Sequence, residues 1–236
     1  MNQVREVERR TRGDQQGSGV LIFGPDDIGK KLLPFLLMEF ITPESGIADR
    51  SQGPPPGVMA FCYQPEPHPE NPLQGGLEWR RGGSQGLQEV GVMQGTPEFR
   101  LWLAASPVPP GQVPDCGRLP LLAIPKIDRI RVLLGVHRGL RSPIRSDRQL
   151  NCFDITLASD ERWDYEPAPG HNIAWLFPYQ GALQVGNHRY LRELIIFKST
   201  AGRLSLRAEG AGAKILMGTA MKVNTSLLDP LRSPWG

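Results

Sequence analysis

Residues 153–186 read FDITLASDERWDYEPAPGHNIAWLFPYQGALQVG, and this stretch decides the fold class. Its apolar and aromatic runs, such as NIAWLFPY (172–179) and ALQVG (182–186), are short and are separated by turn residues. Runs of this kind are typical of β-strands. The dipeptide Gly186-Asn187 suits a tight two-residue hairpin turn with positive φ angles.

Similar short apolar runs, separated by turn residues, occur on both sides of this stretch. Among these runs, ELIIFK (193–198) has a continuous apolar centre and is expected to be buried on both faces, whereas LSLRAE (204–209) alternates and is expected to be half exposed. The sequence also holds 27 Gly and 23 Pro in 236 residues, which indicates many turns and few long helices. We therefore predict an all-β fold, a sandwich or barrel, from these and the remaining runs: GVLIF (19–23), VMAFCY (58–63), EFRLWLAA (98–105), RIRVLLGV (129–136), CFDITLA (152–158) and AKILMGTAM (213–221).

A proline-rich segment divides the chain. Residues 106–126 read SPVPPGQVPDCGRLPLLAIPK, and proline both fixes φ and lacks a backbone donor, so this segment is expected to run extended outside a sheet. We predict two β domains, residues 1–115 and residues 116–236, joined through this connector.

Charge and cysteine content exclude several classes of protein. The net charge is only +3, and the densest basic run, formed by Arg5, Arg9, Arg10 and Arg12, is interpreted as a solvated tail or edge. No aromatic-and-basic repeat accompanies it, so nucleic-acid binding is not expected. Three widely spaced cysteines indicate neither disulfides nor a zinc cluster. With no apolar run long enough for a membrane span, we expect a cytoplasmic protein with no membrane partner.

One segment imitates a phosphate-binding loop. GPDDIGKK (24–31) follows an apolar run and carries glycine and lysine at the positions of that motif. Lys31 replaces the Ser or Thr that would hold magnesium, Asp26 and Asp27 place negative charge where phosphates would lie, and Pro34 interrupts the following helix. We interpret the segment as a surface turn.

The histidines give no complete metal site. His68 and Glu70 are two residues apart, so on a strand their side chains point to one face and could share a metal ion. The other three histidines all follow residue 130. His137 has no neighbouring residues of metal-ligating type, and no carboxylate completes a site around His171, which we expect to be a loop histidine bonded to backbone.

Several segments together resemble the pirins, a two-domain family of the cupin superfamily. FDITLASDERWDYEPAPGHNIAWLFPYQGALQVG is similar to the pirin pattern of a strand, a Pro-x-Gly-His-Asn turn and an aromatic-rich strand. LLPFLLMEFI (32–41), GLEWRRGGSQGLQEV (76–90) and EFRLWLAASPVPPGQVPD (98–115) resemble other pirin segments. The resemblance implies a bicupin of two β-barrels with one iron in the amino-terminal barrel, held by three histidines and a glutamate. Some pirins oxidise quercetin with dioxygen, and others regulate transcription factors.

The chain departs from the pirin pattern at the iron ligands. HPENP (68–72) aligns with the family's His-Pro-His-Arg-Gly, so His68 keeps the first ligand position while Glu70 replaces the second histidine. Gln88 and Val90 stand at the other two positions, or Glu89 and Gly91 if the register is shifted by one residue. The interval between the two segments also lacks a hairpin that pirins have. We therefore expect no cofactor, with an iron-loaded site only as a minor alternative.

The sequence leaves three functions open. The first is a metal-independent module that binds a small molecule or a protein partner, with a regulatory role. The second is a metal-independent enzyme of cyclase or isomerase type, for which His68, Glu70, Gln88 and Glu89, or His171 and Tyr179 in the second barrel, are the candidate residues. The third is the iron-dependent quercetin 2,3-dioxygenase type of activity.

Overall fold

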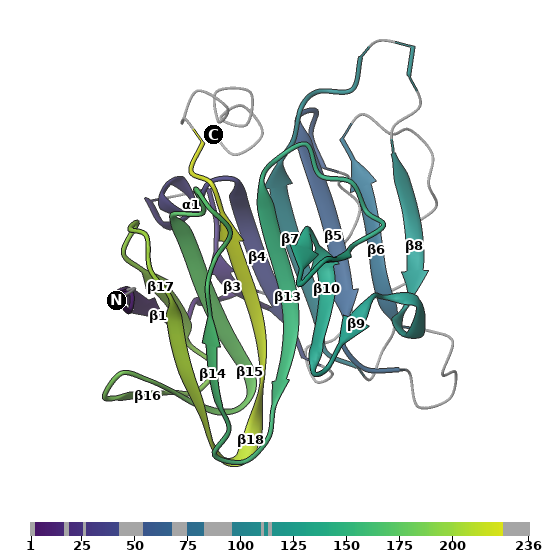
Figure 1. Cartoon of the computed structure of the whole chain (residues 1–236). Coiled ribbons are helices and arrows are strands. Elements are labelled where there is room, and N and C mark those ends of the chain that lie inside the picture. Colours follow the sequence, from purple (N-terminus) through teal and green to yellow (C-terminus); the bar gives the residue numbers. More distant parts are fainter. Residues whose placement is uncertain are drawn as a thin grey trace. The chain divides into compact units, whose positions relative to one another are not determined.

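The computed structural model describes residues 3–16, 19–25, 27–42, 54–67, 75–82, 96–109, 111–112 and 115–223. These residues form two compact units (Figure 1). The first unit holds residues 14–124 together with residue 223, and the second holds residues up to 13 together with residues 125–222. The domain limits at 115 and 116 stay a prediction. No helix in the described ranges is long and apolar enough to cross a membrane.

The first unit is built on a seven-stranded antiparallel sheet. Its apolar strands lie in the middle, and one short helix, α1 (Asp27–Leu32), precedes β4. The strand order is β2 (Asp14–Gln16), β3 (Gly19–Phe23), β4 (Phe35–Ile41), β7 (Glu98–Ala104), β5 (Val58–Gln64), β6 (Gly76–Arg81) and β8 (Cys116–Pro120).

Two segments of the first unit differ from the predictions. The predicted surface turn at 24–31 contains helix α1, because Ile28 and Leu32 are apolar and are buried. The proline-rich connector contributes strand β8, which pairs with β6 alone. An edge strand tolerates Pro120 because the N–H groups on its open side need no partner within the sheet.

The second unit contains a nine-stranded antiparallel sheet that uses both ends of the described chain. Strand β1, from near the amino terminus, pairs with β17 at one edge. The strand order is β1 (Val7–Thr11), β17 (Leu194–Phe197), β15 (Ile173–Val185), β18 (Leu204–Ala220), β13 (Leu150–Leu157), β10 (Ile130–Leu134) and β9 (Lys126–Ile127), with β14 (Arg162–Tyr165) beside β18 and β16 (His188–Tyr190) beside β15. Two short strands, β11 (Val136–His137) and β12 (Leu140–Arg141), form a separate ribbon, and Leu121–Ala123 in the first unit form a 3₁₀ turn.

One face of the nine-stranded sheet carries the core of the second unit. Alternate residues of β13, β15 and β18, such as Phe153, Leu176 and Met217, are fully buried there. As predicted, β17 is buried along its whole length and the start of β18 alternates between buried and partly exposed residues. The alternation of side chains along a strand therefore places apolar residues on this face as the sequence pattern requires.

The two longest strands of this sheet were each expected as two shorter ones. The runs at 172–179 and 182–186 join into β15, and those at 204–209 and 213–221 join into β18. Glycines let both strands bend without breaking, since Gly181 and Gly212 have φ angles of 73° and 97°. They also lie against each other: a Cβ on Gly181 would be 2.0 Å from the carbonyl oxygen of Gly212.

The all-β prediction is confirmed, and two local predictions can be made more exact. The hairpin at Val185 and His188 forms as expected, but only Gly186 of its two turn residues has a positive φ, of 58°. All three cysteines are free, as expected. In the described residues each sheet ends in edge strands and is not closed into a ring.

Candidate functional site

The predicted amino-terminal site cannot be assembled from the described residues. His68, Glu70, Gln88, Glu89 and Val90 all lie outside them, so their candidate roles stay predictions. The strands that flank those segments are described, and they carry a cluster of hydrogen-bonded polar side chains.

This polar group is centred on Glu98 in β7. Glu98 is 2% exposed and accepts hydrogen bonds from Gln64 Nε2 at 3.2 Å and from Arg100 Nε at 3.1 Å. Arg100 also forms an ion pair with Glu39 at 3.7 Å. The carboxylate of Glu98 is thus already held by two donors. Within the described residues, no cluster of three or more His, Cys, Asp or Glu side chains could hold a metal ion.

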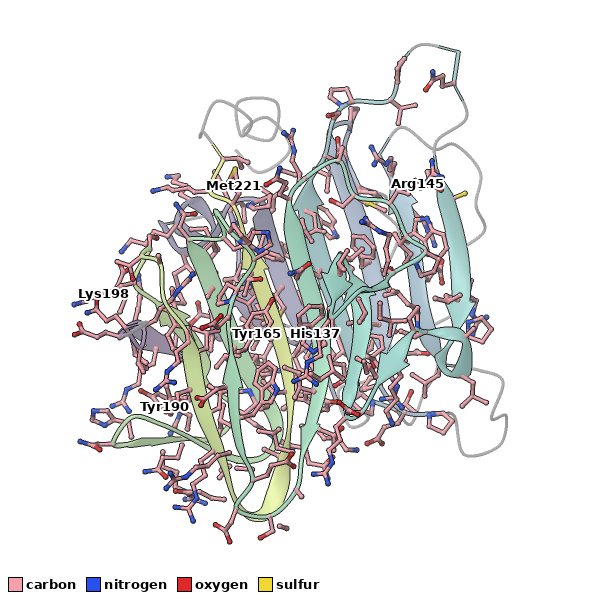
Figure 2. All side chains as sticks on the ribbon, in the orientation of Figure 1. His137, Arg145, Tyr165, Tyr190, Lys198 and Met221 are labelled. Carbon is pink, nitrogen blue, oxygen red and sulfur yellow. The ribbon has the colours of Figure 1, made fainter. Side chains whose placement is uncertain are left out.

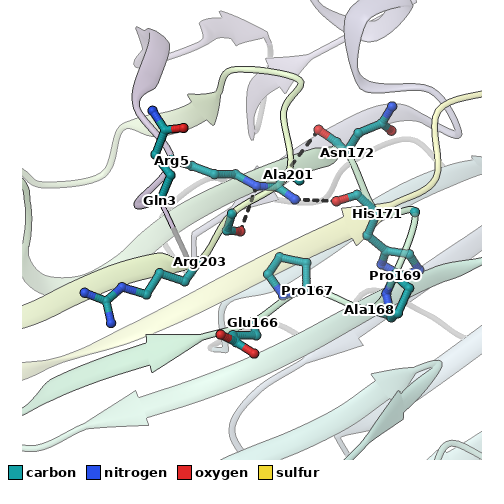
Figure 3. Close-up of a pocket in the computed structure, with 12 residues that line it drawn as sticks. Gln3, Arg5, Glu166, Pro167, Ala168, Pro169, His171, Asn172, Ala201 and Arg203 are labelled. Carbon is teal, nitrogen blue, oxygen red and sulfur yellow. Dashed lines mark hydrogen bonds between the residues drawn. The ribbon is translucent and has the colours of Figure 1, made fainter. Parts of the chain in front are cut away.

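The second unit contains a pocket of about 550 Å³. Its lining comes from three separate segments of the chain: residues near the amino terminus, the turn that precedes β15, and the turn between β17 and β18 (Figure 3). The lining residues are Gln3, Arg5, Glu166, Pro167, Ala168, Pro169, Gly170, His171, Asn172, Ala201, Gly202 and Arg203. This volume lies in the range of small-molecule sites.

Arg5 forms one wall of the pocket and is 4% exposed. Its Nε donates to the carbonyl oxygen of Gly202 at 3.0 Å, Nη1 donates to that of Asn172 at 3.3 Å, and Nη2 donates to that of His171. Burial lowers the pKa of the guanidinium, although an arginine remains charged at neutral pH. One side chain therefore connects the two turns that shape the pocket.

The prediction of a solvated tail or edge is wrong for Arg5. Arg9, Arg10 and Arg12 are exposed on or beside the edge strand β1, as expected. Arg5 differs because its backbone is bonded to the turn before β18: its N–H donates to the carbonyl of Arg203 at 2.9 Å, and Arg203 N–H donates to Gln3 at 3.1 Å. These bonds bring the Arg5 side chain to the pocket.

His171 lies at the end of the Pro-Ala-Pro-Gly-His turn. Its N–H donates to Ala168 at 2.9 Å, and Gly170 before it has a φ of 84°, a conformation that favours glycine. The ring was expected to bond to backbone, and this is wrong: Nδ1 lies 3.0 Å from the hydroxyl of Thr219. Burial, and then the charge of Arg5, lower the pKa of the imidazole. The ring is therefore held neutral near pH 7 at the pocket wall.

Thr219 belongs to a cluster of buried polar side chains within the second unit. Asn151 donates to the hydroxyl of Tyr165 at 3.2 Å and accepts from the N–H of Val136 at 3.0 Å. Burial raises the pKa of Tyr165, while hydrogen bonding to Thr219 and Asn151 opposes the rise. Thr219 is fully buried and lies between His171 and Tyr165. These side chains fix the orientation of the His171 ring.

His137 lies against the same group (Figure 2). Its ring centroid is 5.3 Å from that of Phe153 and 6.1 Å from that of Tyr165. The side chain is buried, and its Nε2 has no hydrogen-bond partner among the described residues. Burial, and then Arg138, lower the pKa of His137, with Asp128 opposing them. The environment thus favours the neutral imidazole.

Tyr179 does not belong to the pocket. Its hydroxyl donates to Asp154 at 2.8 Å, and Arg131 pairs with the same carboxylate at 3.0 Å. Asp154 alternates with the core residues Phe153 and Ile155 along β13, so it points to the opposite face of the sheet. Of the two residues predicted as candidates in this unit, His171 lines the pocket and Tyr179 does not.

The sequence did not reveal the partners of His171. Arg5 and Thr219 are separated from it by 166 and 48 positions, and no local motif links the three residues. The only local signal was the turn PAPGHN itself.

Comparison with known proteins identifies solved structures with a similar fold. No protein-family model and no curated protein sequence matches the chain. Among solved structures, quercetin 2,3-dioxygenase from Acinetobacter baumannii matches with a TM-score of 0.72 and 18% identity, over 93% of this chain and 88% of that one. The protein GK1651 from Geobacillus kaustophilus matches with a TM-score of 0.70 and 16% identity, over 95% and 99%.

A third similar structure is the bacterial pirin YhhW from Escherichia coli in complex with nickel(II). It matches with a TM-score of 0.61 and 11% identity, over 94% of this chain and 100% of that one. At these identities the likeness concerns the fold, which is the all-β cupin type that the resemblance to pirins implies.

Proposed function

We propose that this protein is a cupin-fold binding protein that holds a small molecule in the pocket of its second unit, without a metal ion. The observation that carries the proposal is the pocket of about 550 Å³ whose two turns are joined by the buried Arg5. A pocket that is organised before a ligand arrives loses less conformational entropy on binding.

The donor chemistry of the sequence supports independence from a metal. A pirin has four ligand positions, which we align with His68, Glu70, Gln88 and Val90 of this chain. These positions then offer one imidazole and one carboxylate, and the other two side chains are an amide and an alkyl group. Such a set does not suit iron, which takes imidazole and carboxylate ligands in these sites. The names of two similar structures mention quercetin 2,3-dioxygenase and nickel, and an oxygenase of that type is the least favoured function for this chain.

A metal-independent enzyme of cyclase or isomerase type is the second candidate. One observation favours it: the neutral ring of His171 lines the pocket and is oriented by Thr219. A neutral imidazole beside a bound molecule is suited to accept a proton. Turnover of a bound compound that is lost in His171→Gln and kept in the exposed variant His188→Gln would favour this candidate.

Two further parts of the proposal depend on the sequence. The first is an alternative to small-molecule binding, in which the protein binds a protein partner and has a regulatory role. The second is a cytoplasmic location, with which the free thiols are compatible.

A fragment-binding experiment tests the pocket directly. Ala201 lines it and is exposed, so Ala201→Phe adds a ring to the site, while Ala158→Phe adds the same ring to another exposed position of the second unit. Ligand-detected NMR with a fragment library is expected to give compounds that bind the wild type and Ala158→Phe but not Ala201→Phe. A library without binders, or binders that Ala201→Phe leaves unchanged, would exclude this pocket as the binding site.

A further inference from the structure

We infer that the ligand of this pocket carries a carboxylate, or a similar small anionic group, which binds Arg5. The inference rests on the proposed function and specifies the ligand class of the same pocket. Its basis is a buried positive charge that has no negatively charged partner among the described residues.

The hydrogen bonds of Arg5 show how its charge is accommodated. All three of its acceptors are backbone carbonyl oxygens, those of His171, Asn172 and Gly202, which are dipoles and carry no net charge. A guanidinium has five N–H groups, so one N–H on each terminal nitrogen lies beyond these three bonds. Buried arginines are usually paired with an anion, because desolvation of an unpaired charge is costly.

The other charged residues of the pocket do not neutralise Arg5. Arg203 forms its ion pair with Asp164, at 3.9 Å and in an exposed position. Glu166 lies across the pocket from Arg5 (Figure 3), and none of the three hydrogen bonds of Arg5 is donated to it. His171 is held neutral at this wall. The Arg5 side of the pocket is thus positive, and an anionic group of a ligand would supply the missing counter-charge.

Apolar side chains form another part of the lining. Pro167, Pro169 and Ala201 line the same pocket as Arg5. The geometry therefore suits a carboxylate on a compact apolar body.

Two probes separate charge from shape. Benzoate carries one carboxylate on a ring, and benzamide has the same outline without charge. Isothermal titration is expected to show benzoate binding the wild type at least about tenfold more tightly than benzamide, a difference of about 1.4 kcal/mol.

Variants locate the source of the preference. Arg5→Gln is expected to abolish the preference for benzoate over benzamide, and Arg5→Lys to keep part of it, since a lysine retains the charge without the planar donors. Arg189→Gln, which alters an exposed and already paired arginine outside the pocket lining, is expected to leave the preference unchanged. If Arg5→Gln does not fold, the comparison of the two probes on the wild type and on Arg5→Lys still decides the question.

The outcomes distinguish the inference from the proposed function. Equal affinity for benzoate and benzamide, with both lost in Ala201→Phe, would overturn the anionic ligand and leave the binding pocket in place. A fragment library without any binder sensitive to Ala201→Phe would overturn both proposals.

Discussion

Nη2 of Arg5 donates a hydrogen bond to the backbone carbonyl of His171, a residue 166 positions further along the chain. The same guanidinium bonds Asn172 and Gly202, so it joins the turn before β15 to the turn before β18. The pocket wall therefore depends on one side chain from the far end of the sequence.

Loss of this side chain should destabilise the protein. Arg5→Gln leaves buried carbonyl oxygens without their donors, which is expected to lower the free energy of unfolding by about 2–3 kcal/mol. Urea denaturation measures the change. Arg9→Gln, on the exposed edge strand β1, serves as the matched control and should change stability by less than about 0.5 kcal/mol. Similar values for the two variants would contradict the structural role of Arg5.

Burial of His137 should make stability dependent on pH. Its pKa is lowered from the ordinary value of 6.5, so below that pH the unfolded chain binds a proton more readily than the folded protein. His171 behaves in the same way. Well above pH 6.5, protonation of these two histidines does not affect the free energy of unfolding. It lowers that free energy increasingly as the pH falls through 6.5 towards the pKa of the folded protein.

A substitution isolates the part due to His137. His137→Phe, placed among the rings of Phe153 and Tyr165, should reduce the loss of unfolding free energy between pH 7.5 and pH 5.5 relative to the wild type. The variant His188→Gln, at an exposed position, should lose as much unfolding free energy between these two pH values as the wild type does. Urea denaturation at the two pH values compares all three proteins, and an unchanged slope in His137→Phe would refute the assignment.

The glycines of the segment that imitates a phosphate-binding loop should differ strongly. A Cβ on Gly29 would lie 2.1 Å from the carbonyl oxygen of Gly24, whereas a Cβ on Gly24 meets nothing closer than 3.5 Å. Gly29→Ala should therefore cost about 2 kcal/mol or more in thermal or urea unfolding, and Gly24→Ala well under about 1 kcal/mol. Equal effects would show that close packing does not explain Gly29.

The bond between Tyr179 and Asp154 should be measurable in stability. Tyr179→Phe removes a 2.8 Å hydrogen bond to a carboxylate that is 1% exposed, at an expected cost of about 1–3 kcal/mol. Tyr190 is buried to a similar extent, and its hydroxyl makes no hydrogen bond within the described part of the chain, so Tyr190→Phe is the control and should be nearly neutral. A neutral Tyr179→Phe would mean that this hydrogen bond makes no measurable contribution to the free energy of unfolding.

Metal analysis tests the proposal that the iron site has been lost. Purified protein is expected to contain iron, manganese and nickel far below one ion per chain after exposure to a mild chelator, because two ligands do not retain such ions. One tightly bound ion per chain would instead favour the oxygenase activity.

The fold was largely predictable because strand signals are local. Apolar runs such as GVLIF and ELIIFK each hold the information for one strand, and both form strands where expected. The exceptions come from glycine and proline: Gly181 and Gly212 bend long strands where the sequence predicts separate ones, and Pro120 ends an edge strand where it predicts a connector.

The candidate site was predictable only in part, because its contacts are not local. His171 was identified through the turn that contains it. Arg5 was misassigned, since a basic residue in a polar segment usually lies in solvent and only its pairing with the segment around Arg203 shows otherwise. Thr219 carries no signal at all in the sequence, because a threonine at the end of an apolar strand is common.

The pairing of Val7 with Phe197 also has a consequence for how the protein is made. During translation, β1 leaves the ribosome well before β17, its neighbour in the sheet, has been synthesised. Contacts between such distant segments form slowly, because a long loop must close first. The basic segment with Arg5 therefore stays without its β partner until β17 has been synthesised, and the pocket can be completed only after its lining residues 201–203 have been added to the chain.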